Sequence, residues 1–134
     1  MTADPAASPT SAVVTLVVPA DVRYFRSVRL TVGGLATLVG FDVEAIDDLR
    51  IGVDELCGAL AEAGDGSPLE FQVTTDVGAS IRIAGVTRAG AGTPDPDRFA
   101  FSHQILSVVA DRHALDVDGE ELSCWLERAL DPEP

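Results

Sequence analysis

The chain has 134 residues, 46% of them hydrophobic, a length and composition typical of one globular domain with a single core. Its nine basic residues are all Arg, and the 22 Asp and Glu leave a formal charge of −13, which disfavours nucleic acid as a direct ligand and favours a basic protein. The absence of Lys excludes a Walker-type phosphate loop, and no apolar run reaches the roughly 20 residues of a membrane-spanning helix.

The start of the chain and its two cysteines point to a soluble, cytoplasmic protein. Residues 1–11 carry neither a basic cluster nor an apolar signal core, so we expect a disordered leader, followed by one domain over residues 12–131. Cys57 and Cys124 lie far apart without metal-ligand spacing. Two buried free thiols are therefore expected, and neither a metal nor a cofactor is predicted.

The first half of the domain predicts one strand and two helices. A Val-rich run at Ala12–Val18 is typical of a strand. Apolar residues then recur three or four apart, and again after Asp42, which can cap a second helix that ends at Gly64. The two apolar sets are Val22, Phe25, Val28, Val32, Leu35 and Val39, and then Val43, Ile46, Leu49, Val53, Leu56 and Leu60. Gly33 and Gly34 predict a bend or a close approach in the first helix.

Alternating apolar and polar residues predict a pair of strands after the second helix. The two apolar sets are Leu69, Phe71 and Val73, and then Ile81 and Ile83. Residues 87–97 are rich in Gly, Pro and small residues, which predicts a loop. A third helix is expected from about Asp97 to Asp111, with Asp97 as its cap. Its expected buried stripe consists of Phe101, Ile105, Val108 and Val109.

The end of the domain predicts a hairpin. Asp118 and Gly119 lie between two β-compatible segments and suit a tight type I′ turn. The last segment has both a strand pattern and a helix pattern, and the preceding turn favours the strand. The strand pattern is Leu122, Cys124 and Leu126, and the helix pattern is Leu122, Trp125, Leu126 and Ala129. The order β-α-α-β-β-α-β-β predicts an α+β fold, a two-layer sandwich in which three helices cover one face of a mixed β-sheet.

Three segments carry short, correctly ordered matches to a known family. They are Val28–Val32, Ile51–Cys57 and Phe101–Asp111. The first two resemble the helix-one motif and the nucleotide helix of bacterial anti-sigma factors of the RsbW type, which belong to the histidine-kinase-like ATPases with the Bergerat fold. The third resembles the corresponding segment of actinobacterial anti-sigma-F proteins, and the all-Arg composition suits a GC-rich genome. The resemblance covers nearly the whole chain and implies a homodimeric regulator of a sigma factor.

Typical members of that family bind ATP, but the matching positions here lack the required groups. Glu55 matches the family's acidic residue, whereas the metal-binding Asn falls on Ala59, and the chain contains no Asn. No Asp or Glu occurs between residues 77 and 94, where the family's adenine-reading Asp would lie. Gly90 and Gly92 form only a GxG, and a plain turn is the favoured interpretation. We therefore expect Glu55, Ala59, Gly90 and Gly92 to form a vestigial nucleotide site without ATP or metal.

The remaining acidic and histidine residues offer no catalytic motif. Asp48, Glu55 and Glu62 share a helix face at seven-residue spacing, which is typical of a solvated or salt-bridged surface. His103 is expected on the third helix away from its apolar stripe, and His113 in a polar turn, without any nucleophile elbow. No catalytic residue is predicted.

The first helix carries the candidate partner-binding residues Arg23, Tyr24, Arg26 and Arg29. The resemblance implies that Arg29 matches a family residue that contacts both the sigma factor and a competing anti-anti-sigma protein. These arginines could equally pair with the chain's own carboxylates. The expected function is sequestration of a sigma factor. The alternatives are an active serine kinase that phosphorylates an anti-anti-sigma protein, and a ligand-sensing domain.

Overall fold

Five strands and three α-helices make up the part of the chain that the computed structural model describes, residues 11–92 and 95–132. The strands are β1 (Ser11–Val18), β2 (Leu69–Asp76), β3 (Ser80–Arg88), β4 (Arg112–Asp118) and β5 (Glu121–Ala129). The helices are α1 (Phe25–Val39), α2 (Val43–Ala63) and α3 (Pro96–Val109), with a 3-10 turn, η1 (Val22–Tyr24), before α1. The element order β-α-α-β-β-α-β-β is confirmed. The expected leader lies outside the described residues except for Ser11, which begins β1.

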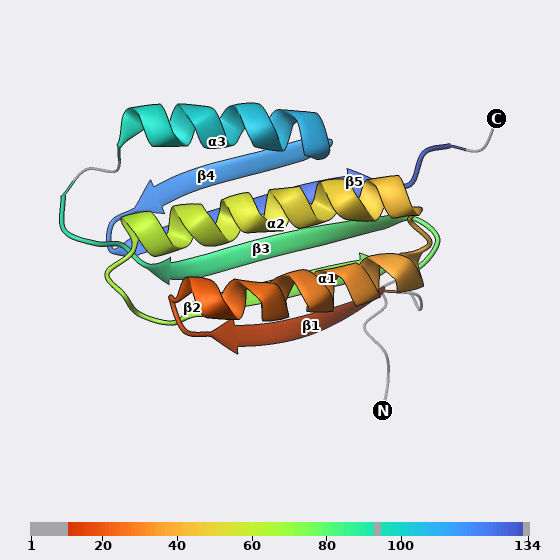
Figure 1. Ribbon diagram of the computed structural model, residues 1–134, viewed down its shortest axis with the longest axis horizontal. Helices are drawn as coiled ribbons and strands as arrows, with labels where there is room; N and C mark the ends of the chain where they lie inside the picture. Colours follow the sequence, from red (N-terminus) through yellow and green to blue (C-terminus); the bar gives the residue numbers. More distant parts are fainter. Residues whose placement is uncertain (1–10, 93–94, 133–134) are drawn as a thin grey trace.

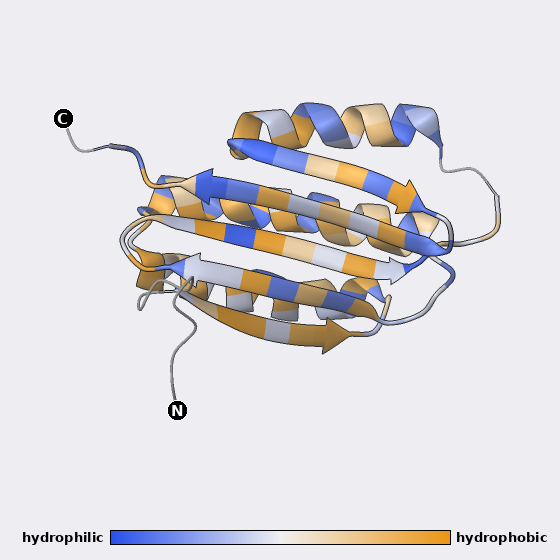
Figure 2. Cartoon of the chain, turned by 180° about the vertical axis from the view of Figure 1, so that it is seen from behind, coloured by the Kyte–Doolittle hydropathy of each residue, from blue (hydrophilic) through white to orange (hydrophobic). Residues whose placement is uncertain are grey.

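The strands form one sheet in the order β1-β2-β3-β5-β4, and all three helices lie on the same side of it (Figure 1). This arrangement confirms the two-layer α+β sandwich. The strand pairs β1-β2, β2-β3, β3-β5 and β4-β5 are all antiparallel, so the described sheet is antiparallel rather than mixed. Two of these pairs, β2-β3 and β4-β5, are antiparallel because they are hairpins. Figure 2 shows the other face of the sheet, which no helix covers.

In strands β2 and β3, buried side chains alternate strictly with half-buried or exposed ones, as the period of two predicted. Phe71 of β2 pairs with Gly85 of β3 in the register. A Cβ at Gly85 would lie 2.8 Å from both the Phe71 ring and the Leu60 side chain, so only glycine fits beneath them. Strand β3 continues to Arg88, two residues into the expected loop, because Thr87 still pairs with β5.

The first two helices begin and end close to the expected residues. The Asp42 side chain accepts a hydrogen bond from the backbone N–H of Ala45, which confirms it as the cap of α2. Gly40 ends α1 with φ = +116°, a left-handed conformation that favours glycine. In α2, a Cβ at Gly52 would lie 2.7 Å from Leu126, so this glycine lets the helix approach β5 closely. No described helix combines the length and apolar character needed to cross a bilayer.

Helix α3 differs from its prediction at the cap and at the buried face. Asp95, not Asp97, is the cap, because its carboxylate accepts the backbone N–H of Asp97 across Pro96, which has no N–H of its own. The side chains buried on α3 are Ser102, Leu106 and Val109. From the expected stripe only Val109 is fully buried, whereas Phe101 and Val108 are exposed and Ile105 is half-buried.

The C-terminal hairpin and the buried thiols were expected correctly. The last segment is a strand, and the tight turn between β4 and β5 consists of Gly119 and Glu120 rather than Asp118 and Gly119. Among described residues only glycines have positive φ, so Gly119 alone carries it, which is the type II′ pattern rather than type I′. Cys57 and Cys124 are free and buried, and burial raises the pKa of the Cys57 thiol to about 12.

Candidate functional site

A cavity of about 430 Å³ lies between the end of α2, the end of β3 and the start of α3. Three of the four residues assigned to the vestigial nucleotide site line it, namely Ala59, Gly90 and Gly92. The structure therefore brings together positions that are more than 30 residues apart in the chain. Further lining residues are Glu62, Ala63, Gly64, Asp65, Ala91, Asp95, Arg98 and Phe99.

Gly90 and Gly92, the two glycines of the GxG, lie at positions where the backbone leaves no room for a side chain or adopts a left-handed conformation. The backbone N–H of Gly90 donates to the carbonyl of Ala63 over 2.8 Å, and a Cβ at Gly90 would lie only 2.7 Å from the carbonyl oxygen of Gly64. Gly92 has φ = +96°, a left-handed conformation. The close crossing of the α2 end with the β3 end accounts for Gly90, and the left-handed backbone conformation accounts for Gly92.

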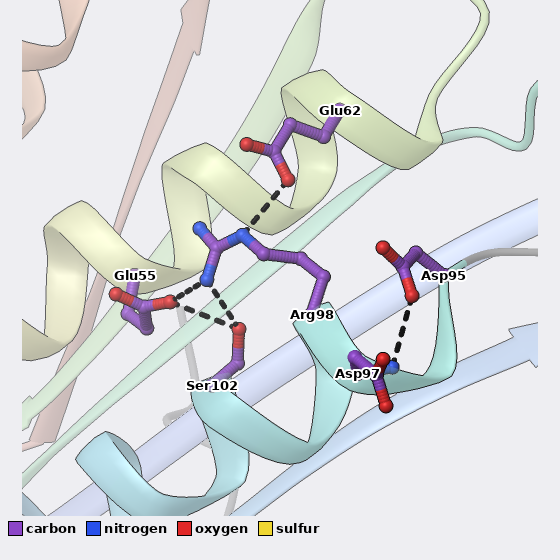
Figure 3. Close-up of polar contacts among 6 residues, drawn as sticks. All are labelled: Glu55, Glu62, Asp95, Asp97, Arg98 and Ser102. Atoms are coloured by element: carbon purple, nitrogen blue, oxygen red, sulfur yellow. Dashed lines mark hydrogen bonds and ion pairs between the residues drawn. The ribbon is translucent and has the colours of Figure 1, made fainter.

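Arg98 of α3 reaches across to α2 and ties the two helices together (Figure 3). Its Nη1 donates to Oε1 of Glu55 in a short ion pair and to the Ser102 hydroxyl at 3.0 Å, and its Nε donates to Oε2 of Glu62 at 2.8 Å. The guanidinium passes over Gly58, where a Cβ would lie 2.9 Å from Nη2. The carboxylate of Glu55 raises the pKa of Arg98 above its usual value. We call Arg98, Glu55, Ser102 and Glu62 the Arg98 clasp.

Glu55 is hydrogen-bonded to two residues of α3, near this cavity. Its side chain is only 12% exposed, and Oε1 accepts hydrogen bonds from both Arg98 and the Ser102 hydroxyl, the latter at 2.9 Å. Ala59 lies one turn later on α2, is buried, and offers only a methyl group. Within the described residues, no three His, Cys, Asp or Glu side chains gather as a metal site. Oε1 of Glu55 thus helps to hold the two helices together, and Ala59 supplies no oxygen to a phosphate-bound cation.

The three acids spaced seven residues apart on α2 are all salt-bridged, and Asp48 and Glu62 remain partly exposed to solvent. Asp48 accepts a hydrogen bond from Arg128 of β5 at 3.0 Å, and Glu55 and Glu62 both pair with Arg98. Sequence reasoning missed Arg98 and its role. A usable signal was the spacing of Arg98 and Ser102, four residues apart on one face of α3.

The proposed partner-binding residues lie together where α1 begins, but they differ in how free they are. Arg23 forms an ion pair with Asp21 at 2.6 Å, and Arg29 with Asp54 of α2 at 2.6 Å. Arg26 is exposed and forms no ion pair or hydrogen bond with another described residue. The Tyr24 ring is partly exposed beside it. Pairing within the chain, the alternative raised from the sequence, thus holds for two of the three arginines.

His103 and His113 are in contact, although the sequence suggested no link between them. His113 lies within strand β4 rather than in a turn, and its Nε2 shares a hydrogen bond with Nδ1 of His103 on α3 at 2.9 Å. Burial, and next the proximity of His103, lower the pKa of His113. The neutral imidazole is therefore the form that this contact favours.

We expect the His pair to make stability depend on pH just below neutrality. A lowered pKa in the folded state means that the unfolded chain binds the proton more readily, so the contribution is present above the ordinary His pKa of 6.5 and is lost as the pH falls through the folded value. The free energy of unfolding in urea should fall between about pH 7.5 and about pH 5.5, and His113→Gln should reduce that fall. An equal fall in the variant would contradict this expectation.

Comparisons with known proteins support the fold. A crystal structure of the RsbU and RsbW domains of a Mycobacterium tuberculosis protein is similar to this chain, with a TM-score of 0.66 and 14% sequence identity. The alignment covers 90% of this chain and 33% of the other, so the chain spans about a third of that structure's length. No protein-family model matches the sequence, and no curated protein matches it either. The fold is therefore RsbW-like, as the resemblance implied.

Proposed function

We propose that this chain is an RsbW-like anti-sigma regulator that sequesters a sigma factor by protein-protein binding, without ATP and without phosphoryl transfer. The RsbW-like fold supports the class of protein. The observation that supports the absence of nucleotide chemistry is the Arg98 clasp, in which Glu55 of the vestigial site accepts hydrogen bonds from Arg98 and Ser102. The regulator would act in the cytoplasm, where sigma factors meet RNA polymerase.

The clasp supports the loss of both steps of a kinase reaction. A general base must have a lone pair within hydrogen-bond reach of the substrate hydroxyl, and the inward oxygen of Glu55 already accepts two hydrogen bonds. Magnesium prefers oxygen ligands, and Ala59 supplies none. The positive charge of Arg98 is taken up by two carboxylates, so it is not available to a triphosphate.

The start of α1 supports the binding half of the proposal. Arg26 is a free cation on a chain of charge −13, and Tyr24 lies two residues before it, both types common among interface residues that carry binding energy. Arg23 and Arg29, held by their carboxylates, would flank the contact and fix its orientation.

Sequestration explains regulation without covalent change. The bound sigma factor would be unable to join RNA polymerase, and an anti-anti-sigma protein that competes for the same α1 surface would release it by mass action. The homodimer implied by the resemblance belongs to this proposal.

The test compares wild-type chain with Arg26→Glu in capture from a native extract, followed by reconstitution with the purified sigma factor. We expect the wild type to retain the sigma factor and Arg26→Glu to lose on the order of 30-fold or more in affinity, because a central cation is replaced by a repelling charge. Arg26 is the better probe than Arg29, whose reversal would also oppose Asp54 within the fold.

Arg112→Glu is the control with the same charge change, at the far edge strand β4, and should bind as the wild type does. Its new charge lies beside Glu127, so its melting temperature is measured first to show that it is folded. The complex should form equally with and without Mg-ATP, and Mg-ATP alone should leave the melting temperature unchanged. A nucleotide at 100 times its Kd would instead stabilise the fold by about 2.7 kcal/mol, and such a shift would favour the kinase alternative. Full retention of the sigma factor by Arg26→Glu would contradict the proposal that the sigma factor binds at the start of α1.

A further inference from the structure

Helix α3 presents an apolar stripe to solvent. Phe101, Ile105 and Val108 follow one another at spacings of four and three residues, so they lie on one face of the helix. Phe101 is 55% exposed and Val108 is 82% exposed, while Ile105 is half-buried. We call these three residues the α3 stripe. Single exposed apolar residues are common, but three in register on one helix face form a contiguous surface.

The position of α3 explains why this face is uncovered. The helix lies along the outer edge of the sandwich, beyond β4, in the views from both sides (Figures 1 and 2). It packs mainly against α2 and β4, with a hydrogen bond from Arg128 of β5 to the Val109 carbonyl, and its buried side chains are Ser102, Leu106 and Val109. The α3 stripe therefore lies outside the contacts that bury the other face of this helix.

The apolar surface continues toward α2 through Ile51, which is 50% exposed. Asp54 pairs with Arg29 of α1, and Glu55 pairs with Arg98 of α3. Ile51 precedes both acids by about one turn, so it lies on the outer ridge of α2 between its two neighbouring helices. An elongated ligand on the α3 stripe would reach this residue.

Exposed carboxylates flank that surface on both helices. Asp47 and Asp54 lie beside Ile51 on α2, with Glu44 one turn earlier, and Asp97 lies on the first turn of α3. Glu44 and Asp97 form no ion pair with another residue in the described part of the chain. Arg50 is the one basic residue of α2 itself, and its Nη1 lies 3.7 Å from Asp47.

We propose that the α3 stripe binds an amphipathic helix of another protein, with an apolar face against Phe101, Ile105 and Val108 and with Arg or Lys along its edges. Charge decides among the occupants of an apolar face. A second copy of this chain, an anionic lipid surface and a nucleic acid would all bring negative charge to a protein of formal charge −13. A basic helix instead gains apolar burial and electrostatic attraction together. This surface is separate from the α1 surface and does not depend on the proposed function.

The probe is a fluorescent synthetic peptide that forms an amphipathic helix with Leu on one face and Lys on both flanks, measured by anisotropy against the full chain. The wild type should bind it, and Phe101→Ser/Val108→Ser should weaken binding by about tenfold or more, because two side chains lose their apolar contacts. Val13→Ser/Leu38→Ser removes two exposed apolar residues of β1 and α1, and should bind like the wild type. Added salt should weaken the interaction.

A peptide with the same Leu face and Glu flanks should not bind. Equal binding of the Lys peptide to both double variants would mean attraction to the overall charge alone and would overturn the proposal. Wild-type dimerisation in sedimentation that Phe101→Ser/Val108→Ser abolishes would also overturn it, in favour of a second copy. Val108→Ser, at the most exposed position of the stripe, repeats the test with a single change that adds no charge and should also weaken binding, and equal melting temperatures show that each variant is folded.

Discussion

Replacing Arg98 by Ala is expected to lower the free energy of unfolding by roughly 1–3 kcal/mol. The change leaves the carboxylate of Glu55, only 12% exposed, with the Ser102 hydroxyl as its remaining partner, and it removes the contact of Glu62 with α3. The value lies below that of a fully buried pair because Arg98 and Glu62 both reach solvent. Urea denaturation monitored by circular dichroism measures it.

Arg112→Ala provides the matched control for this measurement. Arg112 also pairs with a glutamate, Glu127, but its side chain is 67% exposed, so its loss should lower the free energy of unfolding far less than the loss of Arg98. Equal losses in the two variants would mean that the Arg98 clasp contributes no more than a surface ion pair. Adding Glu55→Gln to Arg98→Ala should recover part of the loss, because the stranded charge is then removed.

The Arg98 clasp also bears on whether a single substitution could give this site the ability to bind a nucleotide. Restoring an oxygen ligand by Ala59→Asn would not by itself free Glu55, because Arg98 and Ser102 would still occupy its inward oxygen. The cation that neutralises Glu55 comes from α3, the helix that borders the cavity.

Local patterns were sufficient to predict most of the fold. The Asp42 cap of α2 and the glycines that end α1 and α2 act within one turn, and the alternation in β2 and β3 follows from one buried face. Both can therefore be recognised in short windows. The antiparallel order could not be derived in the same way, because strand pairing depends on contacts far apart in the chain.

Helix α3 and the Arg98 clasp show where local patterns were insufficient. The apolar residues Phe101 and Val108 were expected inside, but the polar Ser102 is buried instead, because Glu55 and Arg98 satisfy its hydroxyl. Glu55 lies on a different helix, so the spacing of Arg98 and Ser102 within α3 could not identify it as the acceptor. Of the α1 residues, the pairing of Arg29 with Asp54 likewise depends on how α1 and α2 pack.

Replacing Gly90 by Ala is expected to destabilise the protein by roughly 1–3 kcal/mol in the absence of any nucleotide. A Cβ there would lie 2.7 Å from the carbonyl oxygen of Gly64 and 3.2 Å from that of Ala63. Both neighbours are backbone atoms, so the end of α2 would have to move away from the end of β3. The hydrogen bond from Gly90 N–H to the Ala63 carbonyl would then be strained or lost.

Gly34→Ala is the control that separates packing from a general effect of removing glycine. A Cβ at Gly34 meets nothing within 4 Å, and the position lies inside α1, so alanine should stabilise the protein by about 0.5–1 kcal/mol. If the free energy of unfolding falls in Gly90→Ala and rises in Gly34→Ala, the loss in Gly90→Ala is due to the close crossing of α2 and β3. An unchanged free energy of unfolding in Gly90→Ala would contradict that account, because it would remove the packing reason for the GxG.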